Sequence, residues 1–169
     1  MNILIKEEDI KNRIKEIGTE INNDYKNKNP ILIGVLKGAF VFLADLLREL
    51  EIPVEIDFLG ISSYTGTKSS GVVRISQDLS LNIEDRDVIL IEDIVDSGRT
   101  LDYIINNLKT KRPRSIAVCA LLNKKDARVV DVPLTYIGFN IPRVFVVGYG
   151  LDYENKFRNL KYIGVYHGE

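Results

Sequence analysis

The chain has 169 residues, of which 45% are hydrophobic and 28% are charged, so it is long enough for a globular domain with a proper core. Its 23 basic and 24 acidic residues leave a formal charge of −1, which gives no electrostatic footprint for nucleic-acid binding, and we expect no nucleic-acid partner. The single cysteine excludes an internal disulfide, and because no apolar run approaches the roughly 20 residues of a membrane span, we expect a cytoplasmic protein with no membrane partner.

The first third of the chain predicts a helix, a strand and a second helix. Apolar residues at helical spacing indicate an amphipathic helix over residues 7–28, which Pro30 ends. The apolar run at 31–36 predicts a buried strand. A turn containing Gly38 follows this strand, and residues 39–50 predict the second helix.

The next segment predicts a hairpin with a long connection. Val54, Ile56 and Phe58 alternate with charged residues, which is typical of a strand with one buried face. Residues 60–71 are rich in Ser, Thr, Gly and Tyr, and this composition favours a mobile loop. Residues 72–79 predict the return strand.

Strands and helices alternate again in the second half of the chain. We predict a strand at 88–91, a helix at 99–108 and a strand at 116–122. Shorter strands are predicted near residues 134–137, 145–147 and 162–165. The alternation favours an α/β fold in which helices cover both faces of a mainly parallel, twisted sheet, with the short strands after residue 130 capping its edge.

Residues 88–101 carry the most informative motif. The apolar strand meets paired acids at Glu92 and Asp93, and a turn of small and polar residues then opens a helix. In α/β sheets, ligands bind where strand ends meet helix starts, and the free N–H groups of such a turn suit a phosphate. The acids suit ribose hydroxyls or a hard cation. The motif is neither a phosphate loop of the Walker type nor a dinucleotide fingerprint.

Asp96 lies in this turn, three residues past the acid pair, where its carboxylate would face the space above the sheet. An aspartate at this place is also a favoured helix N-cap. Both roles remain open from the residues alone.

Three further clusters are candidates for binding. The strand-to-helix turn at 35–39 could cradle a diphosphate, or be an ordinary connection. Lys124, just past a buried strand, could donate to a ligand carbonyl, or be a surface lysine. Phe145 could stack on a planar base, while Asp152 and Arg158 could hold a cation and an anion; a core strand with a solvated turn explains this segment equally well.

The run at 88–101 resembles the signature of type I phosphoribosyltransferases, enzymes that use phosphoribosyl pyrophosphate. Within that family, the chain is similar to the bacterial hypoxanthine–guanine branch from about residue 31 to 165. The most specific matching parts are Val35 to Ala39, Ser63-Tyr64, Ile91 to Thr100, Phe145 to Asp152 and Phe157-Arg158.

The resemblance implies the type I phosphoribosyltransferase fold in one domain that covers residues 1–169. It adds a small hood contributed by the N-terminal and C-terminal segments, and a flexible hairpin loop at about 60–71 that includes Ser63 and Tyr64 and closes during catalysis. The implied reaction is a purine salvage step. It joins hypoxanthine or guanine to phosphoribosyl pyrophosphate, and it gives IMP or GMP and pyrophosphate.

Site residues follow from the resemblance position by position. Asp96 would be the general base at the purine N7, and the peptide bond between Leu36 and Lys37 can be cis. Pyrophosphate would be bound by Lys37, Gly38 and Arg158. Ribose 5-phosphate would be bound by Glu92, Asp93, Asp96, Ser97, Gly98, Arg99 and Thr100. The purine would be bound by Lys124, Phe145, Val146 and Asp152. The implied cofactor is Mg²⁺, and its ligands would be Glu92, Asp93 and Asp152.

Some alternatives stay open at this point. Regulators that share this fold bind RNA or DNA with a basic face, and the cluster from Lys109 to Arg114 could form one, although cations are also favoured near a helix C-terminus. Arg143-Val144 replaces a common Asp-Lys pair, so the resemblance does not settle the choice between hypoxanthine and guanine, or whether xanthine is accepted. Relatives form homodimers or homotetramers, and the apolar residues of the helix at 39–50 could supply the contact.

Overall fold

The main sheet of the computed structural model, which describes residues 1–63 and 72–168, has the strand order β4-β3-β2-β5-β6-β7. These strands are β2 (Ile31–Leu36), β3 (Glu55–Ser63), β4 (Val73–Gln77), β5 (Asp87–Val95), β6 (Ser115–Asn123) and β7 (Tyr136–Asn140). All neighbouring pairs are parallel except the edge pair β3 and β4, which is antiparallel. The predicted mainly parallel sheet is confirmed.

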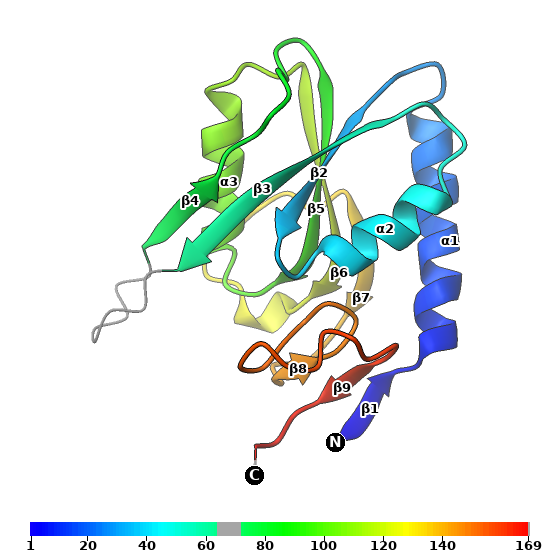
Figure 1. The fold of residues 1–169 in the computed structure, drawn as a ribbon, viewed down its shortest axis with the longest axis vertical. Helices are drawn as coiled ribbons and strands as arrows, with labels where there is room; N and C mark the ends of the chain where they lie inside the picture. The colour runs from blue at the N-terminus through cyan, green and yellow to red at the C-terminus, as the bar shows by residue number, and fades with distance from the viewer. Residues whose placement is uncertain (64–71, 169) are drawn as a thin grey trace.

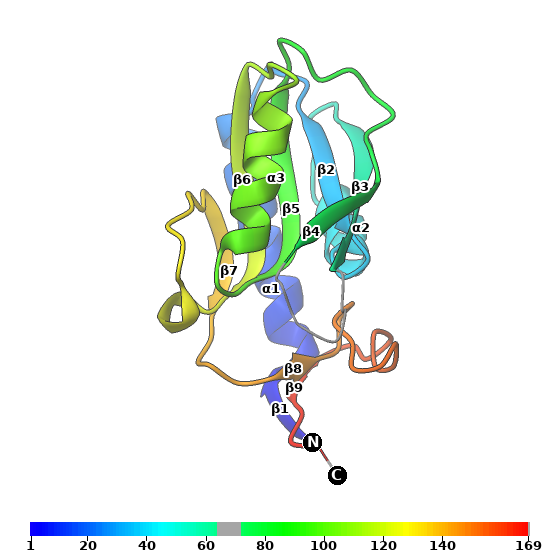
Figure 2. The same ribbon diagram turned by 90° about the vertical axis from the view of Figure 1, so that its left-hand side faces the viewer.

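Helices cover both faces of this sheet, as Figures 1 and 2 show. The helices α1 (Glu7–Asp24) and α2 (Phe40–Arg48) lie on one face, and α3 (Arg99–Lys109) lies on the other. The central strand β5 serves both cores, because its alternate side chains point to opposite faces. Ile89 and Ile91 belong to the core beneath α1 and α2, while Val88 and Leu90 belong to the core beneath α3. Burial on both faces explains its unbroken apolar run.

A second, three-stranded antiparallel sheet lies beyond the end of the main sheet to which the parallel strands run (Figure 1). Its order is β1 (Asn2–Ile5), β9 (Ile163–Val165) and β8 (Val146–Val147), so it joins the two ends of the chain. The periodicity of the sequence does not predict β1. We call this small sheet, with the loop at 148–158, the hood.

Several predicted boundaries are wrong. The first helix ends at Asp24 and not at residue 28, because Asn27 adopts a left-handed turn conformation. Residues 60–63, predicted as the start of a loop, continue β3 and pair with β4. The strand predicted to end at the acid pair continues through Val95, because β6 runs alongside it and pairs with it from Asp87 to Val95. The residues 64–71 of the predicted loop, including Tyr64, lie outside the described residues.

Three of the four basic residues in the cluster near the end of α3 are paired with acids. Lys111 lies 3.1 Å from Asp78, Arg112 lies 2.7 Å from Glu84, and the Arg114 side chain lies 3.2 Å from Asp87. These ion pairs join the cluster to neighbouring acids, so it does not form an unpaired basic face. Among the helices that the structure describes, none has the length and hydrophobicity needed to cross a bilayer.

Candidate active site

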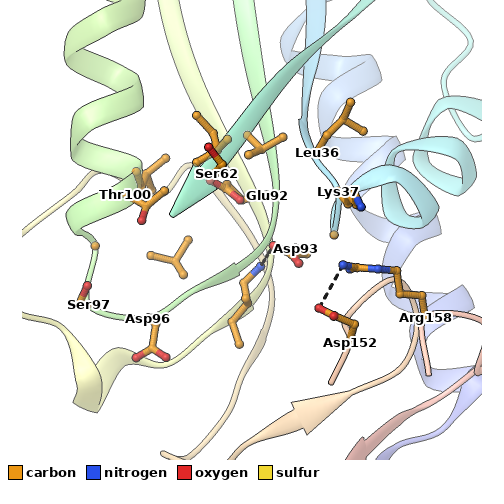
Figure 3. A pocket seen from close by; sticks show the side chains of 17 residues that line it. Leu36, Lys37, Ser62, Glu92, Asp93, Asp96, Ser97, Thr100, Asp152 and Arg158 are labelled. Carbon is orange, nitrogen blue, oxygen red and sulfur yellow. Dashed lines mark hydrogen bonds and ion pairs between the residues drawn. The ribbon is translucent and has the colours of Figure 1, made fainter. Parts of the chain in front are cut away.

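A cavity of about 550 Å³ opens where β2 and β5 end, between the main sheet and the hood (Figure 3). Its polar lining consists of Lys37, Gly38, Ser62, Glu92, Asp93, Asp96, Ser97, Gly98, Thr100, Asp152 and Arg158. Its apolar lining consists of Val35, Leu36, Ile61, Ile94, Val95 and Leu101. Segments far apart in the sequence therefore meet at one carboxyl-terminal strand edge, where α/β folds bind ligands.

One wall of the cavity is the turn that follows β2. The exposed Lys37 side chain lies beside Arg158 in Figure 3, and the Leu36–Lys37 peptide bond is cis, as the resemblance implied. Gly38 has to be a glycine, because a Cβ atom there would overlap the Asp93 carboxylate. This wall thus brings two cations close to the acid-bearing strand.

The hood contributes the charged pair Asp152 and Arg158 to the same wall. The Arg158 Nη2 lies 3.1 Å from Asp152 Oδ1, and its Nη1 donates to the Gly150 carbonyl at 2.7 Å. The Asn155 backbone N–H donates to the other Asp152 oxygen at 2.8 Å. Gly150 packs so tightly on the Gly38 carbonyl that any Cβ atom would overlap it. The hood loop and the turn after β2 are therefore held together.

The opposite wall is the turn between β5 and α3, residues 96–100, which we call the phosphate turn. Asp96, Ser97 and Thr100 line the cavity there, across from Arg158 and Lys37 (Figure 3). Gly98 has a φ of 86°, a left-handed conformation that favours glycine, and it starts α3. The first N–H groups of this helix have no partner within it, and with the helix dipole they favour an anion.

The acid pair lies between these walls, at the end of β5. Burial raises the pKa of Glu92 well above its usual range, and the neighbouring Asp93 raises it further. Burial also raises the pKa of Asp93, to about 6; Asp152 adds to this rise, while the Ile94 backbone N–H and Arg158 oppose it. Both carboxyl groups are therefore harder to ionise than usual, and a cation or a hydrogen-bond donor beside them would favour their ionised forms.

The three predicted metal ligands only partly fit a Mg²⁺ site. Glu92, Asp93 and Asp152 all line the cavity, but the described residues contain no group of three acidic, His or Cys side chains that converges on one point. Mg²⁺ commonly binds one or two carboxylates and takes its other ligands from substrate phosphates and water. Burial raises the pKa of both Glu92 and Asp93, and a bound cation would favour their ionised forms. The donor set fits a substrate-completed site better than a protein cage.

Three of the four predicted purine residues, Lys124, Phe145 and Val146, lie beside the cavity and not on its lining, whereas Asp152 lines it. Lys124 is buried, and its Nζ lies 3.3 Å from Asp96 Oδ2, which joins it to the cavity wall. Phe145 is half exposed and meets the Tyr153 ring edge-on, with centroids 5.9 Å apart. Val146 is buried in β8. Arg99 is exposed and does not line the cavity, and Ser63 ends β3.

Sequence reasoning missed several residues of this site. Ser62 lines the cavity because β3 continues past Gly60, and the Ser- and Gly-rich composition gave the opposite signal. Ile94 and Val95 were missed for the same reason, since β5 runs on past the acids. Arg128 donates hydrogen bonds to the Asp96 carbonyl in the phosphate turn and to the Asn123 side chain, and no local motif predicts these contacts.

Comparison with known proteins agrees with this geometry. Residues 4–154 match the model of the phosphoribosyl transferase domain. The chain is 48% identical to the hypoxanthine-guanine phosphoribosyltransferase of Mycobacterium avium, over 96% of this chain and 84% of that protein. It is 46% identical to a bifunctional TilS/HprT protein of Listeria monocytogenes, again over 96% of this chain, but there it spans only 25% of the relative's length.

Solved structures give the same result. The hypoxanthine-guanine phosphoribosyltransferase of Bacillus anthracis superposes with a TM-score of 0.93 at 40% identity, covering 98% of each chain. The hypoxanthine phosphoribosyltransferase of Staphylococcus aureus superposes with a TM-score of 0.92 at 43% identity, covering 97% of this chain and 90% of that one.

The raised pKa of Asp93 predicts an unusual pH dependence of stability. A carboxyl group whose pKa is higher in the folded state than in the unfolded chain binds more protons when folded, so the free energy of unfolding falls as pH rises from about 4 to 6. We expect Asp93→Asn to be more stable than the wild type at pH 8, by roughly 1–3 kcal/mol, with the difference shrinking towards pH 4. Urea unfolding at both pH values measures this.

Asp78→Asn is the control of opposite sign. The Leu79 backbone N–H and Lys111 hold the pKa of Asp78 below its usual value, so its contribution to stability is present at pH 8 and is lost as pH falls. Its substitution should therefore lower stability at pH 8 only. If Asp93→Asn instead lost stability at pH 8, burial would not govern the ionisation of the acid pair.

Proposed function

Because this chain belongs to the phosphoribosyl transferase family, we propose that it transfers the phosphoribosyl group of phosphoribosyl pyrophosphate to hypoxanthine or guanine, a purine salvage reaction that gives IMP or GMP and pyrophosphate. One observation carries the proposal. A single cavity holds a cationic wall, an acid pair and a helix-opening turn, in the order that pyrophosphate, ribose and 5′-phosphate occupy along the substrate. We propose that residues 1–169 act as one domain in this reaction.

Lys37 and Arg158 bind the pyrophosphate in this proposal, and the close packing of Gly38 lets the backbone approach it. Arg158 already turns towards the cavity through its bond to Gly150. The cations neutralise the charge that develops as the bond from ribose C1′ to pyrophosphate breaks.

The acid pair and the phosphate turn hold the sugar. Glu92 and Asp93 accept hydrogen bonds from the ribose hydroxyls, and these bonds favour the ionised forms of two carboxyl groups whose pKa values are raised in the free site. The backbone N–H groups and hydroxyls of residues 96–100 bind the 5′-phosphate at the start of α3. Carboxylates beneath the sugar also stabilise the positive charge on the ribose in the transition state.

Asp96 and Lys124 act together on the base. The Asp96 carboxylate accepts the proton from purine N7 as N9 attacks C1′, and the Lys124 ammonium donates to the 6-oxo oxygen. The ion pair between Lys124 Nζ and Asp96 Oδ2, 3.3 Å apart, holds the two groups side by side before the base binds. Phe145 stacks on the ring, and the Val146 backbone reads its edge.

Mg²⁺ bound to oxygens of Glu92, Asp93 or Asp152 and to substrate oxygens would supply charge neutralisation for the pyrophosphate.

A regulator that binds nucleic acid is the less favoured candidate. Its basic face would have to come from the cluster after α3, and Lys111, Arg112 and Arg114 are each within ion-pair distance of an acid. We further propose a cytoplasmic location and a homodimer or homotetramer. Of the apolar side chains of α2, Phe42, Leu43 and Leu46 are buried in the core, and Phe40 is 44% exposed and available for such a contact.

A substrate panel tests the proposed function directly. Pyrophosphate release should be measured with phosphoribosyl pyrophosphate, Mg²⁺ and one of hypoxanthine, guanine, xanthine, adenine or uracil. We expect release with hypoxanthine, guanine or both, because Lys124 offers a donor that suits a 6-oxo group. We expect none with adenine, which lacks that group, or with uracil, which is a pyrimidine and not a purine. Release that depends only on adenine or uracil, or that no base stimulates, would overturn the proposal.

Asp96→Asn tests the base. The amide keeps the size of the side chain but cannot accept the N7 proton, so we expect kcat to fall by roughly 10²–10⁴ with nucleotide binding little changed. Steady-state kinetics and nucleotide titration measure the two quantities separately. Near-normal turnover would rule Asp96 out as the general base.

Lys124→Ala tests the assigned purine donor. We expect the KM for hypoxanthine or guanine to rise roughly tenfold or more, and that for phosphoribosyl pyrophosphate to change far less, because a buried donor to the substrate is removed. Lys125→Ala, on the exposed neighbour, is the matched control and should leave both values unchanged. Equal losses for both substrates in Lys124→Ala would contradict the assignment.

A further inference from the structure

The segment that follows β6 supports the phosphate turn from outside, in addition to the hydrogen bond within the turn from the Arg99 N–H to Ser97 Oγ. The Lys124 backbone N–H donates to the Val95 carbonyl at 2.9 Å. The N–H groups of Val129 and Val130 both donate to the Ser97 carbonyl, at 2.9 and 3.0 Å. The turn is thus fixed from outside by a strand end and a loop that lie about 30 residues further along the chain.

In the described part of this segment, only the Arg128 side chain donates hydrogen bonds both to the backbone of the turn and to a buried side chain. Its Nε donates to the Asp96 carbonyl at 3.2 Å, and its Nη2 donates to Asn123 Oδ1. Asn123 is 5% exposed at the end of β6, and its Nδ2 donates in turn to Asn140 Oδ1 at 2.8 Å. A continuous chain of hydrogen bonds therefore runs from the edge strand β7 to the backbone of Asp96.

The stem of Arg128 also packs on the turn. A Cβ atom at Gly98 would lie 2.9 Å from Arg128 Cδ and 2.5 Å from the Val130 carbonyl oxygen. The turn can approach this closely only because residue 98 is a glycine. The guanidinium group cannot lose its proton and presents its donors in one plane, so it fixes both acceptors at a set angle.

We propose that Arg128, tied to Asn123 and Asn140, is a positioning residue that orients the Asp96–Ser97 peptide. This inference rests on the proposed function. The carbonyl of Asp96 and the N–H of Ser97 belong to one planar peptide unit, so the bond from Arg128 Nε sets the direction of both. That plane in turn directs the Asp96 carboxylate towards the base and the N–H groups of the turn towards the 5′-phosphate.

Arg128→Met tests the proposal, because it keeps the apolar stem and removes both hydrogen bonds. We expect kcat to fall roughly 10- to 100-fold, because a small error in the placement of a reacting group lowers the rate by such a factor. We also expect binding of ribose 5-phosphate to weaken roughly tenfold, while binding of free pyrophosphate, on the opposite wall, changes less than about twofold. Kinetics and titration calorimetry give these values, with circular dichroism to confirm that each variant is folded at the assay temperature.

Lys125→Met is the matched control, since it removes one positive charge from the exposed side of the same turn of the chain; it should behave as wild type. Arg128→Lys should recover only part of kcat, because one ammonium group cannot reach both acceptors in the same plane. A kcat for Arg128→Met within twofold of wild type would overturn the inference. Equal losses of ribose 5-phosphate and pyrophosphate binding would overturn it too, because they indicate general damage to the site.

A double-mutant cycle tests the connection to Asn123. If Asn123 acts through Arg128, then Asn123→Ala combined with Arg128→Met should lower kcat no further than Arg128→Met alone. If the reductions in kcat caused by the two single substitutions multiply in the double variant, the two residues act independently, which contradicts the proposal. The wild type is assayed first, and if no base supports pyrophosphate release, the proposed function is wrong. If the wild type is active and Arg128→Met is fully active too, only the proposed role of Arg128 is wrong.

Discussion

Two adjacent carboxyl groups at the end of a central strand, Glu92 buried and Asp93 partly buried, are the constraint around which the rest of the site is arranged. Glu92 is 6% exposed, and the pKa values of both Glu92 and Asp93 are raised because burial disfavours their ionised forms. A protein that needed only stability would place apolar side chains here. Keeping the acids prepares the site for a ligand that brings hydroxyl donors and positive charge, so the unbound site carries a cost in stability that binding relieves.

The surrounding elements complement this buried charge from two sides. Arg158 and Lys37 lie on one wall, and the start of α3 with its partial positive charge lies on the other (Figure 3). The turn after β2 comes close to the acid pair and to the hood loop only where side chains are absent. Gly38 packs on Asp93, and Gly150 packs on Gly38. The glycines thus determine how near the hood comes to the sheet, and with it the width of the cavity.

Much of the fold was predictable because its causes are local. The predicted strand at 31–36 and the predicted start of the helix at 99 agree with the structure. Both depend on signals that lie within a few residues of each other, namely an apolar run and the turn after β5. The strand ends were not predictable in the same way. β3 continues through Ser63 and β5 through Val95 because partner strands pair with them, and pairing overrides a Gly- and Ser-rich or acidic composition.

The sequence by itself determined which chemical groups the protein has and where along the chain they cluster: an acid pair, a small-residue turn, a Lys-Gly turn and a late Asp and Arg. Only the tertiary structure decided which of them share a cavity and what holds them in place. Arg128 bonds to Asp96 across 32 residues of chain, and Lys124 reaches the same aspartate across 28. Such contacts depend on the side-by-side alignment of β5 and β6, which is a property of the assembled sheet and leaves no periodic signal in either strand.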